Sequence, residues 1–263
     1  MNEAFDIAAI AYDDVFTHSH IGKYQRELVY YSLAKTLSTH KNLNILEINC
    51  GTGHDAIWLA NKGHRILATD ISSQMITIAK TKLSSNQNQL EFRQLDINAL
   101  NETHFDDSFD LIFSNFGGLN CLSPIQLHTF FNSASKILKP EGKIIGVIMP
   151  KNCLFENIYF ILKRNFKNVF RRNTKNSIAV NVDGNLVKTW YYNPKNIRKF
   201  SKNNFRVNKV RPIGFFIPPS YLEPFFKKKL GLLRLLNRSD RIVKHFSFLS
   251  KYSDHYLISL QSK

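Results

Sequence analysis

The chain has 263 residues, 43% of them hydrophobic, which is enough for one large domain, and no apolar run approaches the roughly 18 residues of a membrane-spanning helix. The N-terminal stretch lacks the features of a secretory signal, and Cys50, Cys121 and Cys153 show no metal-binding spacing, so we expect a cytoplasmic protein with buried thiols and no metal site. The net charge of +16 excludes an acidic protein and leaves nucleic acid, an anionic membrane or an acidic substrate as classes of partner.

Strands and helices alternate through the first 150 residues. Helical spacing at 29–37 supports a helical N-terminal cover over residues 1–42. Apolar runs predict strands at 44–48, 64–70, 90–96, 109–116 and 142–150, and amphipathic patterns predict helices at 54–63, 72–85 and 123–140. Ser72 and Ser123 are suited to cap two of these helices. The pattern predicts an α/β fold, a doubly wound and mostly parallel sheet with helices on both faces.

The pattern changes after Pro150. The sequence predicts a helix at 153–172, a hairpin at 177–192 turning at Asp183-Gly184, a helix at 193–203, a strand at 205–216, a basic helical stretch at 218–251 and a last strand at 254–261. We interpret 151–192 and 217–250 as two insertions that form a helix and hairpin cap. They belong to a single domain that spans residues 1–263.

A glycine turn joins the first predicted strand to its helix. In Gly51-Thr52-Gly53 the first glycine can adopt a conformation that other residues avoid, and the second allows a ligand to approach the backbone. The helix that follows offers free N–H groups to an anion. Residues 51–56 also satisfy the Gly-x-Gly-x-x-Ala fingerprint, with Asp70 about 20 residues on, so NAD is an alternative ligand.

Three carboxylates and an amide narrow the choice of nucleotide. Glu47 lies inside the first strand, where a buried charge is costly unless the ligand supplies a cation such as an ammonium. Asp70 ends the second strand, where it can accept hydrogen bonds from both hydroxyls of a ribose, and Asp96 ends the third, where it can accept from an exocyclic amine. Asn115 and a Gly-Gly pair open the carboxyl edge of the sheet, where ligands bind in such folds.

These features, in this order, resemble the class I S-adenosylmethionine-dependent methyltransferases, which have a seven-stranded Rossmann-like sheet. The resemblance covers residues 43–150 and extends to the strand at 254–261. The family's glycine motif reads Glu/Asp-x-Gly-x-Gly-x-Gly, and residues 47–53 match it except that Asn49 replaces the first glycine. Asn tolerates left-handed backbone better than most residues. The resemblance implies that residues 43–150 form the cofactor-binding core of a methyltransferase.

The resemblance also implies S-adenosylmethionine as the cofactor, and it implies the residues that bind it. These are Glu47, Asn49, Gly51 and Gly53 for the methionine part, Asp70 for the ribose hydroxyls, Ile71 and Met75 near the ribose and adenine, Asp96 and Ile97 for the adenine, and Asn115 beside the reactive methyl.

Methyl transfer from a sulfonium is an in-line displacement that alignment of donor and acceptor can promote, and it needs a base only where the acceptor loses a proton. The sequence shows no diagnostic base. Residues 12–27 precede the first strand, where this family often covers the cofactor. The candidate substrate residues there are Tyr12, Phe16, His18 and Arg26. We expect His18 and His20 to lie in a solvated loop, and His128 and His255 to be structural.

The last part of the chain concentrates the positive charge. Residues 151–263 contain 24 Lys and Arg against 5 Asp and Glu, whereas residues 1–150 contain 12 against 15. Aromatic residues in the two insertions favour a small-molecule acceptor that is lipophilic or aromatic. The apolar stripe of 220–236 is expected to pack on its own domain, with peripheral contact with an anionic inner membrane surface as the alternative. The basic charge keeps an RNA methyltransferase as an alternative function, and an NAD-binding protein is less favoured.

Overall fold

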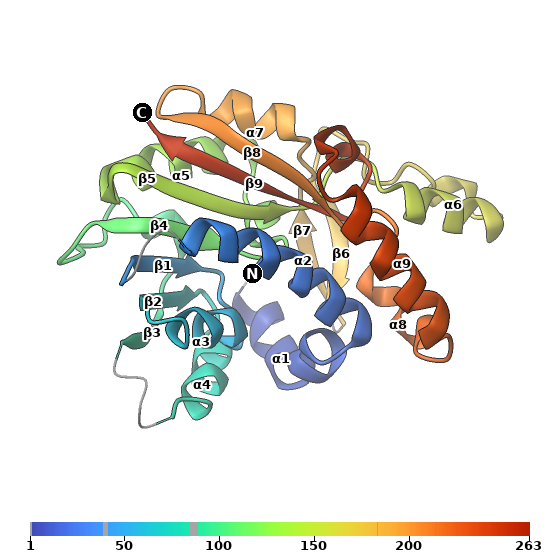
Figure 1. Cartoon of the computed structure of the whole chain (residues 1–263), viewed down its shortest axis with the longest axis horizontal. Helices are drawn as coiled ribbons and strands as arrows, with labels where there is room; N and C mark the ends of the chain where they lie inside the picture. Colours follow the sequence, from blue (N-terminus) through green and yellow to red (C-terminus); the bar gives the residue numbers. More distant parts are fainter. Residues whose placement is uncertain (1, 39–41, 85–88, 183) are drawn as a thin grey trace.

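A seven-stranded sheet runs through the centre of the computed structural model, which describes residues 2–38, 42–84, 89–182 and 184–263 (Figure 1). The strands are β1 (Asn44–Ile48), β2 (Arg65–Asp70), β3 (Leu90–Gln94), β4 (Phe109–Ser114), β5 (Leu138–Ile148), β8 (Phe205–Ile213) and β9 (His255–Ser262). Their order is β3-β2-β1-β4-β5-β9-β8. Only β9 is antiparallel to its neighbours β5 and β8 within this sheet. The predicted doubly wound, mostly parallel sheet is confirmed.

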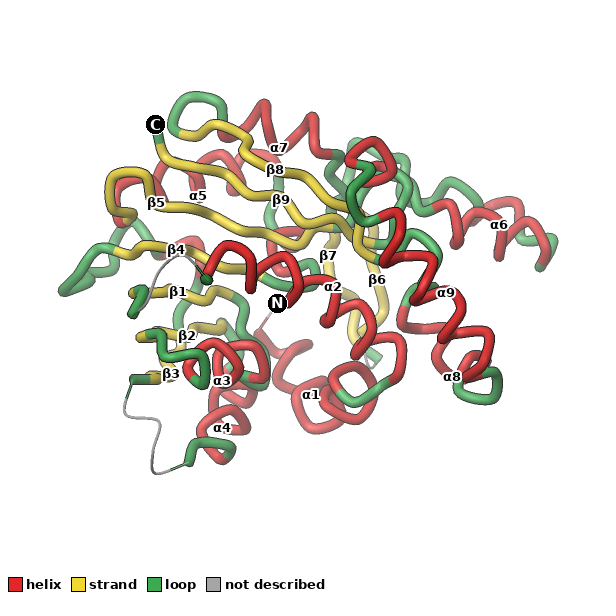
Figure 2. Tube along the Cα trace, in the orientation of Figure 1, coloured by secondary structure: helices red, strands yellow, loops and turns green. Residues whose placement is uncertain are grey.

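Helices cover both faces of the sheet (Figure 2). The first face carries α2 (His20–Leu37), α3 (His54–Ala60) and α4 (Ser73–Thr81), and the second carries α5 (Pro124–Ile137) and α7 (Pro194–Ser201). Side chains alternate between the faces, so Ile45 packs into the first core and Leu46 into the second, both fully buried. Burial on both faces explains why the strands are continuous apolar runs in the sequence.

The two predicted serine caps are confirmed. Ser72 Oγ accepts a hydrogen bond from Met75 N at 3.1 Å and starts α4. Ser123 Oγ accepts from Gln126 N, while the Gln126 side chain accepts from Ser123 N at 3.0 Å, which completes a capping box at the start of α5.

Three predicted helix boundaries are wrong. The helix expected at 153–172 is shorter, α6 (Leu154–Leu162), because Arg164 adopts a left-handed φ of 55° just after it. The helix expected at 123–140 ends at Ile137, since Pro140 disfavours helical backbone in the residue before it. The stretch 218–251 divides into α8 (Glu223–Phe226) and α9 (Leu230–Val243), because Lys229 between them has non-helical backbone.

The insertions and the N-terminal segment meet beyond the carboxyl ends of the strands. The hairpin of β6 (Ile178–Val182) and β7 (Asn185–Thr189) forms a separate two-stranded sheet, and α1 (Asn2–Tyr12) contacts both of its strands. Asp183, in the predicted hairpin turn, lies outside the described residues. Figure 1 shows α6, α8 and α9 projecting together at one end of the molecule.

Candidate active site

Polar residues that interrupt or follow the apolar strands lie close together at the carboxyl ends of β1, β2 and β4. Asp70, at the end of β2, accepts a hydrogen bond from Gly51 N at 2.8 Å through Oδ2 and one from Ser72 N at 3.0 Å through Oδ1. Asn115, just after β4, donates from Nδ2 to Asp55 Oδ2 at 2.9 Å. Asp55 lies in the first turn of α3. These contacts bring the glycine turn, Asp70 and Asn115 together at the carboxyl edge of the sheet.

Left-handed backbone shapes the glycine turn. Asn49, Gly51 and Gly53 have φ values of 56°, 54° and 79°, so Asn49 adopts the conformation that the family motif gives to glycine. A Cβ at Gly53 would lie 2.5 Å from the Phe92 ring. Gly53 is therefore required for core packing beneath the turn. Close approach of a ligand to Gly53, which the sequence suggested, stays a prediction.

Two buried charges at this edge each have an atom without a hydrogen-bond partner among the described residues. Glu47 is 1% exposed and its Oε2 has no partner. Burial, and then the negative charge of Asp55, raise the pKa of Glu47 well above its ordinary value, although Arg26 acts in the opposite direction. Arg26 donates from Nε to Asp55 Oδ1 at 2.9 Å, while its Nη1 has no partner.

Aromatic rings enclose the Arg26 guanidinium. It lies 5.5 Å from the centroid of Phe16 and 5.1 Å from that of Phe116, which is within range for cation–π attraction. Asp55 also accepts from Tyr30 Oη at 2.6 Å. Arg26 and Asp55 therefore hold each other in a fixed orientation at the start of α3.

The N-terminal segment closes over this cluster. A π-helical turn (Asp13–Thr17) follows α1, and Asp13 accepts a hydrogen bond from Thr52 Oγ1 at 2.7 Å and pairs with Lys82. Asp6 accepts from Ser72 Oγ at 2.5 Å. The cavity left beneath has a volume of about 20 Å³, room for one water. A cavity of this size is too small to hold a nucleotide.

The predicted site residues differ in how close they lie to this cavity. Its lining includes Tyr12, Arg26, Asn49 and Asn115, together with Cys50, Thr52, His54, Asp55 and Phe116. Phe16 packs on Phe116 with ring centroids 4.9 Å apart. His18 does not line it, and its exposed side chain lies 3.8 Å from Asp14.

The residues expected near the ribose and adenine differ in how far their side chains are exposed to solvent. Met75 is buried at 2% exposure, while Ile71 and Ile97 are half-buried. Asp96 accepts hydrogen bonds from the backbone N and the side-chain Nδ2 of Asn98, both at 2.9 Å.

Sequence analysis did not identify several residues around Arg26 and Asp55 as part of the site. Asp55 was detectable only as an acid in the first turn of a helix, and Tyr30 carried no signal. His255 Nδ1 lies 3.1 Å from Asp254 Oδ2, and its ring meets the Phe116 ring edge-on at 5.6 Å between centroids. The expected solvated loop at His20 is wrong, because its backbone N and Nδ1 both contact Glu223 Oε1, at 3.0 and 2.9 Å.

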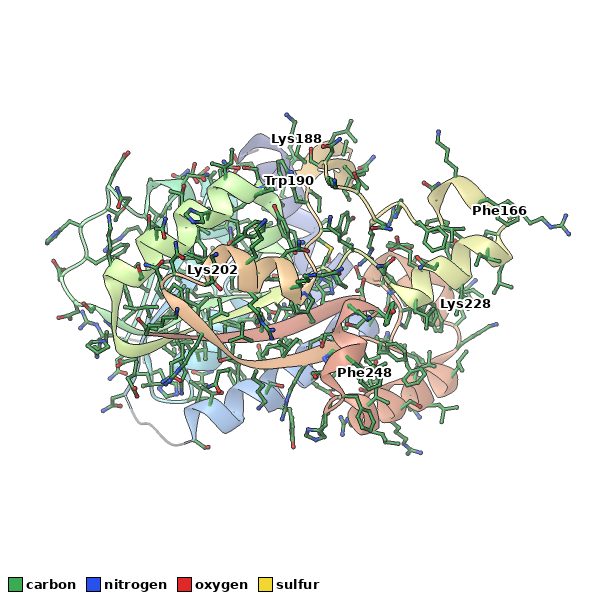
Figure 3. The ribbon with its side chains drawn as sticks, turned by 90° about the horizontal axis from the view of Figure 1, so that it is seen from above. Phe166, Lys188, Trp190, Lys202, Lys228 and Phe248 are labelled. Carbon is green, nitrogen blue, oxygen red and sulfur yellow. The ribbon has the colours of Figure 1, made fainter. Side chains whose placement is uncertain are left out.

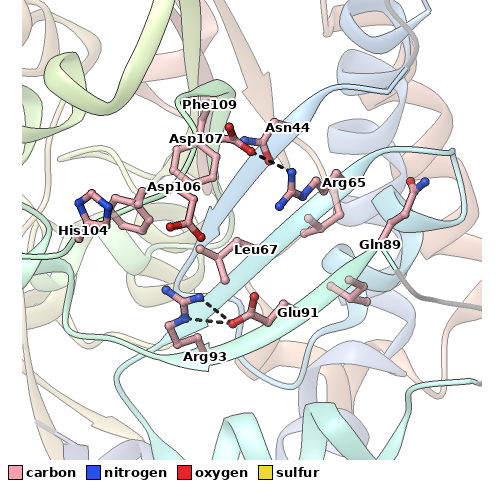
Figure 4. Close-up of a pocket in the computed structure, with 13 residues that line it drawn as sticks. Asn44, Arg65, Leu67, Gln89, Glu91, Arg93, His104, Asp106, Asp107 and Phe109 are labelled. Carbon is pink, nitrogen blue, oxygen red and sulfur yellow. Dashed lines mark hydrogen bonds and ion pairs between the residues drawn. The ribbon is translucent and has the colours of Figure 1, made fainter.

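A second groove lies at the amino ends of the strands (Figure 4). It has a volume of about 240 Å³ and is lined by β1, β2, β3 and the loop before β4. Arg65 pairs with Asp107 and Arg93 with Glu91 across it, at 2.9 and 2.8 Å. Because it opens at the edge opposite the glycine turn, we do not assign it to the active site.

Comparison with known proteins agrees with this geometry. The family model of a methyltransferase domain matches residues 45–142. The malonyl-[acyl-carrier protein] O-methyltransferase of Bacillus anthracis is 30% identical over 135 residues, which is 49% of this chain and 47% of that protein. The demethylmenaquinone methyltransferase of Clavibacter sepedonicus is 28% identical over 141 residues, 54% of each chain. The chain thus spans about half the length of these relatives.

A solved structure extends the similarity over nearly the whole fold. The magnesium protoporphyrin IX methyltransferase of Synechocystis, solved with bound S-adenosylhomocysteine, superposes with a TM-score of 0.55 over 93% of this chain and 84% of that one, at 13% identity. Residues 45–142 thus match a methyltransferase domain, and the chain as a whole is similar in fold to a methyltransferase solved with S-adenosylhomocysteine.

Two other kinds of site are absent from the described part of the chain. Within the described residues, no helix combines the length and apolar character needed to cross a bilayer. No cluster of three or more His, Cys, Asp or Glu side chains suited to a metal ion occurs in the same part of the chain.

Proposed function

We propose that this protein transfers the methyl group of S-adenosylmethionine to a small-molecule acceptor with a lipophilic or aromatic body. The observation that carries the proposal is the pair of unsatisfied buried atoms, Glu47 Oε2 and Arg26 Nη1. The amino-acid end of the cofactor has an ammonium and a carboxylate. Glu47 would accept from the ammonium and Arg26 would donate to the carboxylate, so each buried charge would gain the partner that its burial requires.

The remaining cofactor contacts follow the strand ends. Asp70 would accept from the ribose hydroxyls, and Asp96 from the adenine amine. Ile71, Met75 and Ile97 would pack beside the ribose and adenine once the cover has opened. Asn115, fixed by its bond to Asp55, would lie beside the methyl group. The cofactor supplies an electrophilic methyl on a sulfonium, and these residues contribute by fixing its orientation and excluding water.

Arg26 changes role in this proposal. The sequence placed it among the candidate substrate residues, but its bond to Asp55 turns it toward the cofactor cluster. Tyr12 and Phe16 line or adjoin the same cavity and remain candidates for contact with both ligands. His18 has no contact that supports a substrate role, since its side chain faces solvent beside Asp14.

We place the acceptor side where β4 ends and β9 begins. Phe116 and the edge-on ring of His255 offer an apolar wall with one titratable group. Asp254 Oδ2 lies 3.1 Å from His255 Nδ1, close enough for an ion pair, although Nδ1 forms no hydrogen bond with any described residue. We therefore assign His255 as the base for an acceptor that loses a proton from oxygen or nitrogen.

The class of acceptor rests on the insertions and on the relatives. The two insertions place aromatic pairs such as Phe155–Phe226 and Tyr159–Tyr221 against each other, with centroids 5.9 and 6.5 Å apart. The proteins similar to this chain are named for malonyl-[acyl-carrier protein], demethylmenaquinone and magnesium protoporphyrin IX. These names support a small-molecule or carrier-bound acceptor for this chain as well.

A labelled-methyl assay tests the proposal. The purified protein is incubated with S-adenosylmethionine labelled in the methyl group and with cell extract divided into lipid, RNA and small-molecule fractions. We expect label in the lipid or small-molecule fraction, and less of it with Glu47→Gln when S-adenosylmethionine is limiting. Label in the RNA fraction alone would establish the RNA methyltransferase instead.

A further inference from the structure

Exposed apolar side chains concentrate in one part of the molecule, which we call the basic lobe and define as residues 151–176 and 217–252. It contains α6, α8 and α9 and the segments that join them to the sheet. Of the 21 large apolar side chains that are exposed among the described residues, 14 lie in the lobe. They include Leu162, Phe166, Phe170, Leu235, Ile242 and Phe248. A monomeric soluble domain rarely gathers this much exposed apolar surface without a partner.

Helix α9 and the residues before it divide the apolar side chains of the lobe between two faces. Of the apolar stripe at 220–236, Leu222, Phe226 and Leu233 are buried, whereas Phe225 is exposed. Leu232, Leu235 and Ile242 occupy positions i, i+3 and i+10, and all three are exposed. The helix therefore has a second apolar stripe that faces away from the core, flanked by exposed Arg234 and Arg238.

The acidic residues of the lobe are occupied by internal contacts. Glu156 is buried and pairs with Arg171 and Arg172 at 2.6 Å each. Asp240 is buried and accepts from the backbone N–H groups of 215–217. Glu223 accepts from Ile21 N at 3.0 Å and from His20. No acid of the lobe is therefore left to neutralise its surface.

Most basic residues of the lobe, in contrast, face solvent, with Arg172 the buried exception. The exposed ones that make no ion pair with any described residue include Lys163, Lys167, Lys227, Lys228, Arg234 and Arg238. Figure 3 shows Phe166 at the far end of the α6 segment, with Lys228 and Phe248 on the neighbouring C-terminal helices. The same lobe thus combines exposed cations with exposed Phe, Leu and Ile side chains.

We propose that the basic lobe docks this protein on an anionic lipid membrane, with the exposed apolar side chains of α6 and α9 entering the boundary between headgroups and acyl chains. Lys and Arg near an anionic leaflet are attracted by its surface potential, and apolar side chains on the same surface gain burial in the acyl region. A nucleic acid would use the cations but would leave the aliphatic side chains in water, so the apolar residues favour the membrane.

Binding of the full chain to lipid vesicles tests the proposed membrane docking. The experiment needs neither cofactor nor acceptor. The protein is sedimented with vesicles of phosphatidylcholine alone, or of equal parts phosphatidylcholine and phosphatidylglycerol. We expect binding only to the anionic vesicles, weakening as salt is added. Lys227→Gln, Lys228→Gln and Arg234→Gln together should weaken it on the order of 100-fold, while the matched triple Lys195→Gln, Lys199→Gln and Lys202→Gln on α7 should not.

The apolar variants distinguish a membrane from any other anionic partner. Leu235→Gln with Ile242→Gln should weaken vesicle binding at least about tenfold, whereas Ile125→Gln, an exposed apolar residue on α5, should not change it. All three positions are exposed, so circular dichroism should show an unchanged fold. Absence of binding to anionic vesicles, or equal binding to neutral ones, overturns the proposal. The proposal is also overturned if only the charge variants lose vesicle binding and the apolar variants bind RNA as well as the unaltered protein does. That result would identify nucleic acid as the partner.

Discussion

At the scale of single residues, the site is defined by charges that were buried without partners. A carboxylate inside a strand and a guanidinium between two aromatic rings are both costly to desolvate, and one hydrogen bond from each side chain remains to be made. A zwitterionic ligand would satisfy both, as we propose for the amino-acid end of S-adenosylmethionine.

Glu47→Gln should weaken binding of S-adenosylhomocysteine by about 1.5–3 kcal/mol, the range for a hydrogen bond to a charged group. Because burial raises the pKa of Glu47 in the free protein and an ammonium would lower it, binding should release a proton, and affinity should rise with pH from the ordinary carboxyl range up to the raised pKa. Calorimetry in buffers of different ionisation enthalpy measures this release. Glu47→Gln should abolish it, and an unchanged release would exclude Glu47 as its source.

His255→Ala should lower kcat for methyl transfer about 100-fold, as expected for loss of a positioned base, and leave the affinity for S-adenosylhomocysteine unchanged. His128→Ala, on the exposed face of α5, is the matched control. If kcat is the same in both variants, His255 has only a packing role.

At the scale of elements, the cover and the lobe are each attached by few polar contacts. The cover is held by Asp13 through Thr52 and Lys82, and by Asp6 through Ser72. The lobe is held by Arg172, which joins Glu156 of α6 to Asp254 before β9, and by Glu223, which accepts hydrogen bonds from the start of α2.

Asp13→Asn should open the cover more often, because it removes the charge that pairs with Lys82. Both the association and the dissociation rate of S-adenosylhomocysteine should rise several-fold, with a smaller change in affinity, since a partly exposed ion pair is worth at most about 1 kcal/mol. Surface plasmon resonance resolves the two rates. Equal rates in both proteins would mean that the cover moves without breaking this contact.

Arg172→Ala should lower the free energy of unfolding by about 3–5 kcal/mol, because it removes the buried cation that Glu156 and Asp254 share. Burial alone would raise the pKa values of Glu156 and Asp254, but Arg172 for Glu156, and His255 and Arg172 for Asp254, hold them below the ordinary range. The stability they contribute is present above the unfolded pKa near 4 and is lost as pH falls. Urea unfolding measures both effects; a loss no larger than that of Lys163→Ala would contradict the assignment.

The sequence predicted the elements better than their ends. Apolar runs and serine caps are local signals, so the strands of the core and the starts of α4 and α5 could be read directly. The end of α6 depends on the left-handed backbone of Arg164, which no periodicity encodes. In the site, Glu47 and Asp70 were visible because they interrupt or end apolar strands. The bond from Arg26 to Asp55 joins residues 29 apart and was not predictable from either neighbourhood.

At the scale of the whole molecule, two halves of opposite charge character share one fold. The excess of Lys and Arg after residue 150 was evident in the composition. The packing of α6 against α8 brings these residues together with exposed apolar side chains in one lobe, and the composition did not predict this. The cofactor edge and the lobe are joined through Asp254 and His255, so a lobe seated on a membrane would hold the acceptor side of the site near that surface.

Binding calorimetry with S-adenosylhomocysteine and, separately, with NAD tests the central claim most directly. The account predicts saturable binding of one S-adenosylhomocysteine per chain, weakened by Glu47→Gln and by Arg26→Gln, and no heat with NAD. Binding of NAD without binding of S-adenosylhomocysteine would contradict it.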